Sequence, residues 1–348
     1  MPAFPIFLKR QEKQMKVYLS VPDTAMWKTY FPEDMLKELN ENHDFRRQSS
    51  ENLSKEEWIR EIGDAECVIS HWCTPKFTSD VLSACPNLKI IAHAAGSVAG
   101  VCSDSVFEKG ITVITANLIM SKYVAEAILG HLITSLRGNV DLHMRMVSGE
   151  IWPKEKTPSK SLFGAKIGFI GLGMVGRNLL NLLEPFAPEV LVFDPYIKEE
   201  TLSKWPFARL VSSIDEAVSA RDAVTIQASK TKETYHMVNE RVLSLMANGT
   251  HIVNCARGAL IDEKSLLNEL EKGRLYATLD VYEDEDHPEA IPFRNAANIT
   301  LLPHVGGAPS RENMTRAILD AVMLFEKGEK TGLEVSHRQF TLMTHETL

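Results

Sequence analysis

The stretch KIGFIGLGMVG, residues 166–176, decides the fold of this chain. It begins as a short apolar run that predicts a buried strand, and the helical pattern NLLNLLEPF follows closely after it. Gly171 would allow a tight turn, Gly173 would let the backbone approach a pyrophosphate, and Gly176 would let the helix pack close on the strand. A strand, a glycine turn and a helix in this order predict a dinucleotide site, with the pyrophosphate at the helix N-terminus.

The same motif predicts an acidic residue about 20 positions further on, at the end of the next strand. Asp194 ends the apolar run VLVFD at about that distance. Its carboxylate would accept hydrogen bonds from the adenosine ribose hydroxyls and would repel a 2′-phosphate, so we expect NAD as the cofactor. Lys198, close behind, keeps NADP open as an alternative.

Short apolar runs alternate with helical patterns along most of the chain, which predicts α/β architecture with parallel sheets. Runs without polar alternation suit strands that helices cover on both faces. We therefore expect two doubly wound parallel-sheet domains. The expected strands are residues 16–20, 65–70, 88–94 and 111–115 in the first half, and 166–171, 190–194, 223–228, 250–256, 276–282 and 298–304 in the second. Expected helices include 34–40, 55–62, a long one over 124–147, and a last one over 311–327.

Composition excludes several kinds of partner. Lys and Arg number 38 against 46 Asp and Glu, and this net charge of −8 would repel the phosphate backbone of a nucleic acid. No apolar run approaches the roughly 20 residues of a membrane helix. The five cysteines form no CxxC pair and are odd in number, so we expect no metal site, and reduced thiols in a cytoplasmic protein. Residues 1–14 and 329–348 have no assigned role beyond a loose extension and a tail or interface arm.

Three further motifs follow predicted strands of the second half: NCARG at 254–258, DVYEDE at 280–285, and PHVGG at 303–307. Ligands of open α/β sheets bind at the carboxyl ends of the strands, so these motifs predict one shared site. Arg257 would offer a planar fork to a carboxylate. His304 could hold or give a proton, and Glu285 could orient its imidazole. Glu283 or Asp284 could instead take the orienting role, or the acidic run could be a solvated loop.

With these motifs the chain resembles the D-isomer-specific 2-hydroxyacid dehydrogenase family, over about residues 16–327. The resemblance implies a Rossmann NAD-binding domain, 121–305, inserted into a discontinuous, flavodoxin-like substrate domain, 1–120 and 306–348, with a cleft that closes over the substrate. It also implies a homodimer, for which the helix over 124–147 is the natural contact. The implied catalytic residues are Arg257, Glu285 and His304. The implied cofactor contacts lie near Met174, Val175, Asp194, Ala228, Cys255 and Asp280, with Asp280 on the nicotinamide carboxamide.

The resemblance further implies a reaction in which NADH delivers hydride to C2 of a 2-oxo acid and yields a D-2-hydroxy acid. Protonated His304 would give its proton to the carbonyl oxygen. Arg257 would bridge the carboxylate and the carbonyl, and backbone N–H groups near Gly96 and Ser97 would hold the far side of the carboxylate.

The chain departs from the family pattern at two places. Asp286 stands where a proline usually follows the catalytic glutamate, and AHAAGSVAGVC at 92–102 lacks the aspartate common in that loop. The identity of the acid therefore stays open. His71 and Trp72 could line the substrate pocket or belong to the core, and the first half shows no arginine cluster for a phosphate. Two alternatives remain: a formate-dehydrogenase-like enzyme, which would need no His–Glu pair, and a non-catalytic NAD-sensing scaffold, which turnover of a 2-oxo acid would exclude.

Overall fold

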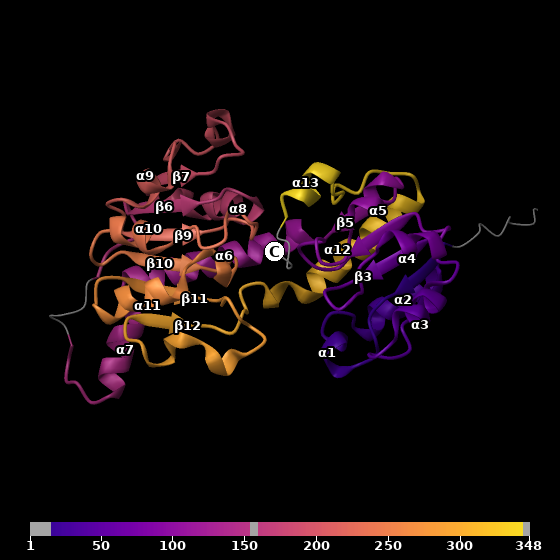
Figure 1. Ribbon diagram of the computed structural model, residues 1–348, viewed down its shortest axis with the longest axis horizontal. Coiled ribbons are helices and arrows are strands. Elements are labelled where there is room, and N and C mark those ends of the chain that lie inside the picture. The colour runs from indigo at the N-terminus through magenta and orange to yellow at the C-terminus, as the bar shows by residue number, and fades with distance from the viewer. Residues whose placement is uncertain (1–14, 154–158, 344–348) are drawn as a thin grey trace, which may run out of the picture. The chain divides into compact units, whose positions relative to one another are not determined.

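The computed structural model describes residues 15–153 and 159–343. The N-terminal extension, residues 1–14, lies outside the described residues, as do the last five residues of the tail over 329–348. Backbone contacts divide the chain into two units (Figure 1). Among the described residues, the smaller unit comprises 15–116 together with Glu312–His337, and the larger unit comprises 117–153, 159–311 and 338–343. The domain limits expected from the sequence, after residues 120 and 305, differ from these by a few residues, and residues from 338 onward were expected in the substrate domain.

The smaller unit is built on a five-stranded parallel sheet in the order β2-β1-β3-β4-β5. This strand order is flavodoxin-like, as the family resemblance implied for this domain. The strands are β1 (Lys16–Leu19), β2 (Asp44–Arg47), β3 (Cys67–Ser70), β4 (Ile90–His93) and β5 (Thr112–Thr115). The sequence did not indicate β2, because DFRR is short, mostly polar, and pairs only along one edge of the sheet.

Helices from both ends of the chain belong to this unit: α1 (Ala25–Lys28), α2 (Glu33–Asn42), α3 (Lys55–Ile62), α4 (Ser79–Ala84), α5 (Asp104–Glu108) and most of α12 (Arg311–Glu326). Sequence explains α3 well: Ser54 and Glu57 form a capping box, and Trp58 and Ile62 supply its buried face. α12 joins through contacts such as the hydrogen bond from the Met15 N–H to Glu326. The unit is therefore discontinuous in sequence.

The larger unit is built on a seven-stranded parallel sheet in the order β12-β11-β10-β9-β6-β7-β8. The direction of strand order reverses between β6 and β9, as in a Rossmann fold. The strands are β6 (Lys166–Ile170), β7 (Glu189–Phe193), β8 (Ala208–Leu210), β9 (Ala223–Ile226), β10 (His251–Asn254), β11 (Tyr276–Leu279) and β12 (Ile299–Leu301). Six of them were predicted, and the three-residue β8 was not.

The helices of this unit are α6 (Asn117–Leu136), α7 (Asn139–Val147), α8 (Met174–Leu183), α9 (Ile214–Val218), α10 (Glu240–Leu245) and α11 (Glu263–Glu271), and α13 (His337–Thr341) begins where the two units part along the chain. The prediction of one continuous helix over 124–147 was wrong. α6 starts earlier and ends before Gly138, whose φ of +66° stops the helix and lets α7 start in a new direction. Within the described residues, no helix is both long and apolar enough to span a membrane.

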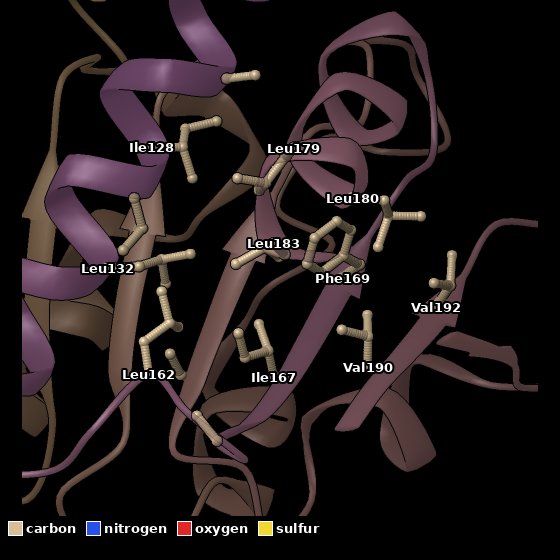
Figure 2. Close-up of a cluster of buried hydrophobic side chains, with 14 of the residues drawn as sticks. Ile128, Leu132, Leu162, Ile167, Phe169, Leu179, Leu180, Leu183, Val190 and Val192 are labelled. Atoms are coloured by element: carbon tan, nitrogen blue, oxygen red, sulfur yellow. The ribbon is translucent and has the colours of Figure 1, made fainter. Parts of the chain in front are cut away.

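A buried apolar cluster holds α8 against the sheet (Figure 2). Leu179 and Leu183 of α8 point toward Ile167 and Phe169 of β6, and α6 supplies further side chains such as Ile128 from the side. These side chains are fully buried, and each contributes about 1.5–3 kcal/mol relative to an exposed position. The packing therefore fixes the start of α8 and the glycine turn before it.

Candidate active site

The glycine turn between β6 and α8 has the geometry that the sequence predicted. Gly171 has φ of +92°, and a Cβ there would lie 2.7 Å from the backbone nitrogen of Ala228. A Cβ on Gly173 would meet nothing within 4 Å, so the backbone is open at this point to a ligand. A Cβ on Gly176 would lie 3.2 Å from Leu172, which shows how closely the helix approaches the turn. The positive φ and the close approach of Ala228 require glycine at Gly171, and the absence of a side chain at Gly173 leaves the backbone accessible.

The first turn of α8 begins with Met174 and Val175, and no side chain caps it. Its N–H groups and helix dipole therefore fit an anion such as a pyrophosphate. Asp194, just after β7, braces the turn: it accepts hydrogen bonds from the N–H of Leu172 at 2.8 Å and of Tyr196 at 2.9 Å. Each carboxylate oxygen keeps a further lone pair, so ribose hydroxyls could still bind.

The NCARG turn follows β10 and is closed by its own asparagine. The Asn254 amide donates to the carbonyl oxygen of Arg257 at 2.9 Å, and its oxygen accepts from the Ala256 N–H at 3.0 Å. Cys255, between them, packs against the cluster of Figure 2. Burial raises the pKa of the Cys255 thiol, and the charge of Asp280 raises it further. A neutral thiol is a packing group rather than a nucleophile.

The NCARG turn packs directly on the loop that follows β11. A Cβ on Gly258 would lie 1.9 Å from the carbonyl carbon of Tyr282 and 2.2 Å from the nitrogen of Glu283. No side chain fits in that space. This close approach of two backbones holds Arg257 beside the loop that carries Glu285.

Glu285 and His304 form a pair across the ends of β11 and β12. His304 Nδ1 lies 2.7 Å from Glu285 Oε2, and the Tyr282 N–H donates to Glu285 Oε1 at 3.1 Å. Burial acts to raise the pKa of Glu285, but the hydrogen bond and charge of His304, the Tyr282 N–H and the Arg257 charge together hold it below its usual value. The carboxylate is therefore ionised near neutral pH and suited to hold a protonated imidazole.

The backbone at His304 is strained. Its φ of +53° lies in the left-handed region, which costs a non-glycine residue about 1–2 kcal/mol. Asp280 stabilises this turn from below: its two carboxylate oxygens accept hydrogen bonds from the N–H of Val305 at 2.8 Å and of Gly306 at 2.7 Å. The sequence interpretation gave Asp280 to the nicotinamide carboxamide and missed this contact. The signal for it was the paired glycine of PHVGG, since a Cβ on Gly306 would lie 2.9 Å from Asp280.

The other acidic residues of DVYEDE have different partners. Glu283 accepts a hydrogen bond from the Tyr235 hydroxyl at 2.6 Å and lies 3.1 Å from His236 Nε2. Asp284 lies 2.9 Å from Nδ1 of His287. Of the three candidates for the orienting role, Glu285 is therefore the one that the structure places on His304.

A cavity of about 360 Å³ borders the pair. Beyond Glu285 and His304, its walls are mostly apolar: Tyr282, Pro288, Ile291, Leu301, Leu302 and Pro303, with Arg294 as the remaining charged residue. The side chains of His304 and Glu285 are 47% and 38% exposed, so the pair is accessible to a ligand from this cavity.

Gly96 and Ser97 lie in the smaller unit, just after β4. Thr115 Oγ1 donates to the carbonyl oxygens of Ala95, at 2.8 Å, and of Gly96, and the Ala99 N–H donates to Ser97 Oγ at 3.3 Å. The loop is thus fixed at the carboxyl end of the five-stranded sheet. Of the expected site residues, the structure brings Arg257, Glu285 and His304 together in the larger unit, and describes Gly96 and Ser97 within the smaller one.

A glycine turn open to an anion and a His–Glu pair, both at strand ends of one parallel sheet, are features that a nucleotide-dependent oxidoreductase needs. Residues 129–306 match the family model described as D-isomer specific 2-hydroxyacid dehydrogenase, NAD binding domain. The chain belongs to this family, as the resemblance indicated, and this region binds a nicotinamide cofactor.

Two named relatives and one solved structure show how similar this chain is to known proteins. The chain is 33% identical to D-3-phosphoglycerate dehydrogenase of Methanocaldococcus jannaschii, over 74% of this chain and 48% of the relative. It is 30% identical to hydroxypyruvate reductase of Thermotoga maritima, over 75% and 84%. It thus spans about half the length of the phosphoglycerate dehydrogenase. Among solved structures, the PH0520 protein of Pyrococcus horikoshii matches with a TM-score of 0.76 and 25% identity, over 94% of this chain and 97% of that one.

Proposed function

We propose that this chain is an NAD-dependent oxidoreductase that interconverts a 2-oxo acid and a D-2-hydroxy acid. The observation that carries the proposal is the 2.7 Å contact between His304 and an ionised Glu285, at the same sheet edge as Arg257. The relative named hydroxypyruvate reductase supports this reaction class. A formate-dehydrogenase-like enzyme has no use for such a pair.

The residues at the glycine turn fit the cofactor, since Gly173 leaves its backbone open and α8 has no side-chain cap. Bound NADH would supply a hydride to C2 of the substrate. Asp194, with a carboxylate at the end of β7, favours NAD because it would repel the 2′-phosphate of NADP.

This chain's residues would then handle the proton and the charge. Glu285 holds Nδ1 of His304, which leaves Nε2 to give a proton to the carbonyl oxygen during reduction and to take it back during oxidation. Arg257 would bind the carboxylate with its planar fork and polarise the carbonyl. Backbone N–H groups at Gly96 and Ser97 would hold the other side of the carboxylate.

An assay of NADH oxidation with a panel of 2-oxo acids tests this function. Loss of NADH absorbance is followed with glyoxylate, hydroxypyruvate, pyruvate, phenylpyruvate and branched-chain 2-oxo acids, with NADPH and with His304→Ala in parallel. We expect turnover with NADH that falls by about 10²–10⁴ in the variant. NADH binding without turnover on any acid would contradict the proposal and favour the NAD-sensing scaffold. NAD reduction by formate would favour the other alternative.

We also infer a homodimer in the cytoplasm. α7 has no buried residue, and apolar side chains stay exposed along it and just after it: Val140, Met144, Met146, Val147, Ile151 and Trp152. Exposed apolar side chains gathered in one short segment support a protein interface there. We expect light scattering to give a dimer that Val147→Glu weakens. A monomeric wild-type protein would contradict this.

A further inference from the structure

A cluster of aromatic rings occupies the carboxyl end of the smaller sheet, where β1 and β3 lie side by side. Trp27 and Tyr30 come from the segment after β1, and His71 and Trp72 come directly after β3. The direction of strand order in this sheet reverses between these two strands. Ligands of open α/β sheets bind at such a switch point, so the position of the cluster is that of a binding site.

His71 is the centre of the cluster. Its ring centroid lies 4.4 Å from that of Trp72, 4.5 Å from Trp27 and 4.6 Å from Tyr30, all nearly edge-on. The imidazole is fully buried, yet neither ring nitrogen has a hydrogen-bond partner among the described residues. A buried polar ring without partners is costly, and such groups commonly mark functional positions.

Trp72 forms the open side of the cluster. It is 50% exposed, whereas Trp27 is 4% and Tyr30 is 8% exposed. Tyr30 meets it edge-on, with ring centroids 6.0 Å apart at 87°. The indole therefore packs against His71 and Tyr30 on one side and presents apolar surface to solvent on the other. A rigid aromatic side chain of this kind binds apolar groups with little loss of conformational entropy.

The cluster and the Gly96–Ser97 loop follow neighbouring strands of the smaller sheet. β3 and β4 are paired neighbours, with Ser70 opposite His93, and the Ala94 N–H donates to the Ser70 carbonyl oxygen at 2.9 Å. Ser70 Oγ also lies 3.0 Å from Nδ1 of His93. A ligand whose carboxylate binds at that loop would thus have the aromatic cluster one strand away.

Arg47, one of the cations at this end of the sheet, is already committed to backbone and acidic partners. Arg47, at the end of β2, donates to the carbonyl oxygens of Val21 at 3.0 Å and Pro22 at 2.6 Å, and pairs with Asp23 at 3.1 Å. Its side chain is only 15% exposed. It is therefore poorly placed to bind a phosphate on a substrate.

We propose that Trp72, backed by His71 and Tyr30, binds the side chain of the 2-oxo acid, and that the enzyme acts on acids with aromatic or branched apolar side chains rather than on phosphate-bearing ones. The inference rests on the proposed function for the reaction and on the cluster for the substrate class.

The test compares phenylpyruvate with glyoxylate, which has no side chain. We expect Trp72→Ala to lower kcat/KM for phenylpyruvate about tenfold, mainly through KM, and to leave glyoxylate within about twofold, while Trp72→Phe keeps most of the activity. Phe163→Ala, which removes another exposed ring far along the chain, is the matched control and should change neither substrate. Equal losses on both substrates, or a wild-type preference for 3-phosphohydroxypyruvate, would overturn the inference.

A binding measurement separates this inference from the proposed function. Calorimetric titration of phenylpyruvate into the NADH-loaded protein needs no turnover. Binding that Trp72→Ala weakens about tenfold, without turnover in the wild type, would support the aromatic site and contradict the reaction. Absence of phenylpyruvate binding, or a Kd that Trp72→Ala leaves unchanged, would overturn the aromatic site, whichever substrate the enzyme reduces.

Discussion

Nδ1 of His304 lies 2.7 Å from Oε2 of Glu285, and the turn that carries His304 is tied to Asp280 through the two N–H groups that follow it. The imidazole is thus fixed both by its ring and by its backbone. Such double restraint keeps a strained residue in place, and it suggests that the orientation of Nε2 matters more than the stability of the turn.

Replacement of Glu285 tests the pair. In Glu285→Gln the protonated imidazole loses its anionic partner, so we expect kcat for 2-oxo acid reduction to fall about a hundredfold. The alkaline limb of kcat/KM should also move to lower pH. Glu283→Gln is the matched control, because that carboxylate contacts Tyr235 and His236 instead. The assignment would be wrong if the two variants lost activity equally with unchanged pH profiles.

Asp280→Asn tests the support of the turn. An amide keeps one acceptor but turns its NH₂ toward an N–H donor, and a hydrogen bond to a charged group contributes about 1.5–3 kcal/mol. We expect the free energy of unfolding to drop by about 2 kcal/mol and kcat to fall. Chemical denaturation and the Kd for NADH should be measured together. Weaker NADH binding with unchanged stability would instead support the carboxamide role that the resemblance implied.

Gly258→Ala tests the close approach of the two loops. The new Cβ would lie 1.9 Å from a backbone carbon of Tyr282, so one loop must move and carry Arg257 or Glu285 with it. We expect kcat/KM to fall more than tenfold and the Kd for NADH to change less, because the glycine turn after β6 lies two strands away from the NCARG turn in the sheet. A variant with wild-type kcat/KM would show that the separation of the two loops is unimportant for the reaction.

Much of this could be predicted because the signals are local. The glycine turn, six strands of the larger sheet and the three catalytic candidates each depend on a few consecutive residues with a fixed chemical role. The strands β2 and β8 were not predicted, because DFRR and ARL are short and form strands only by pairing with a neighbouring strand. The break at Gly138 was missed because one glycine in an apolar periodic stretch is often tolerated within a helix.

The parts of the site that were not predicted are contacts between segments far apart in the sequence. Asp280 reaches the turn after His304, and Gly258 meets Tyr282, across gaps in sequence that no pattern connects. Similarly, HWCT reads as two aromatic residues after a strand, and only the fold places Trp27 and Tyr30 against them. Residue types predict the chemistry of a site, whereas packing decides which residues support it.

Buried histidines predict how stability depends on pH. Burial lowers the pKa of His93 from 6.5 to about 3 and that of His251 to about 4. Both rings are neutral in the folded protein but take up a proton near pH 6.5 when the chain unfolds. Their contribution to stability is therefore complete above pH 6.5 and is lost progressively as the pH falls toward the folded pKa values.

As the pH falls from 6.5 to 5, proton uptake by each of these histidines in the unfolded chain should lower the free energy of unfolding by about 2 kcal/mol. Glu285 has a lowered pKa and titrates at more acidic pH, whereas burial raises the pKa of Glu263, so a histidine variant is needed to assign the change in this window. We expect Tm to fall clearly from pH 7 to pH 5. His251→Phe keeps the stacking on Tyr276 and removes one titrating ring, so its Tm should depend less steeply on pH. A wild-type Tm that stays constant over this range would contradict the neutral burial of these rings.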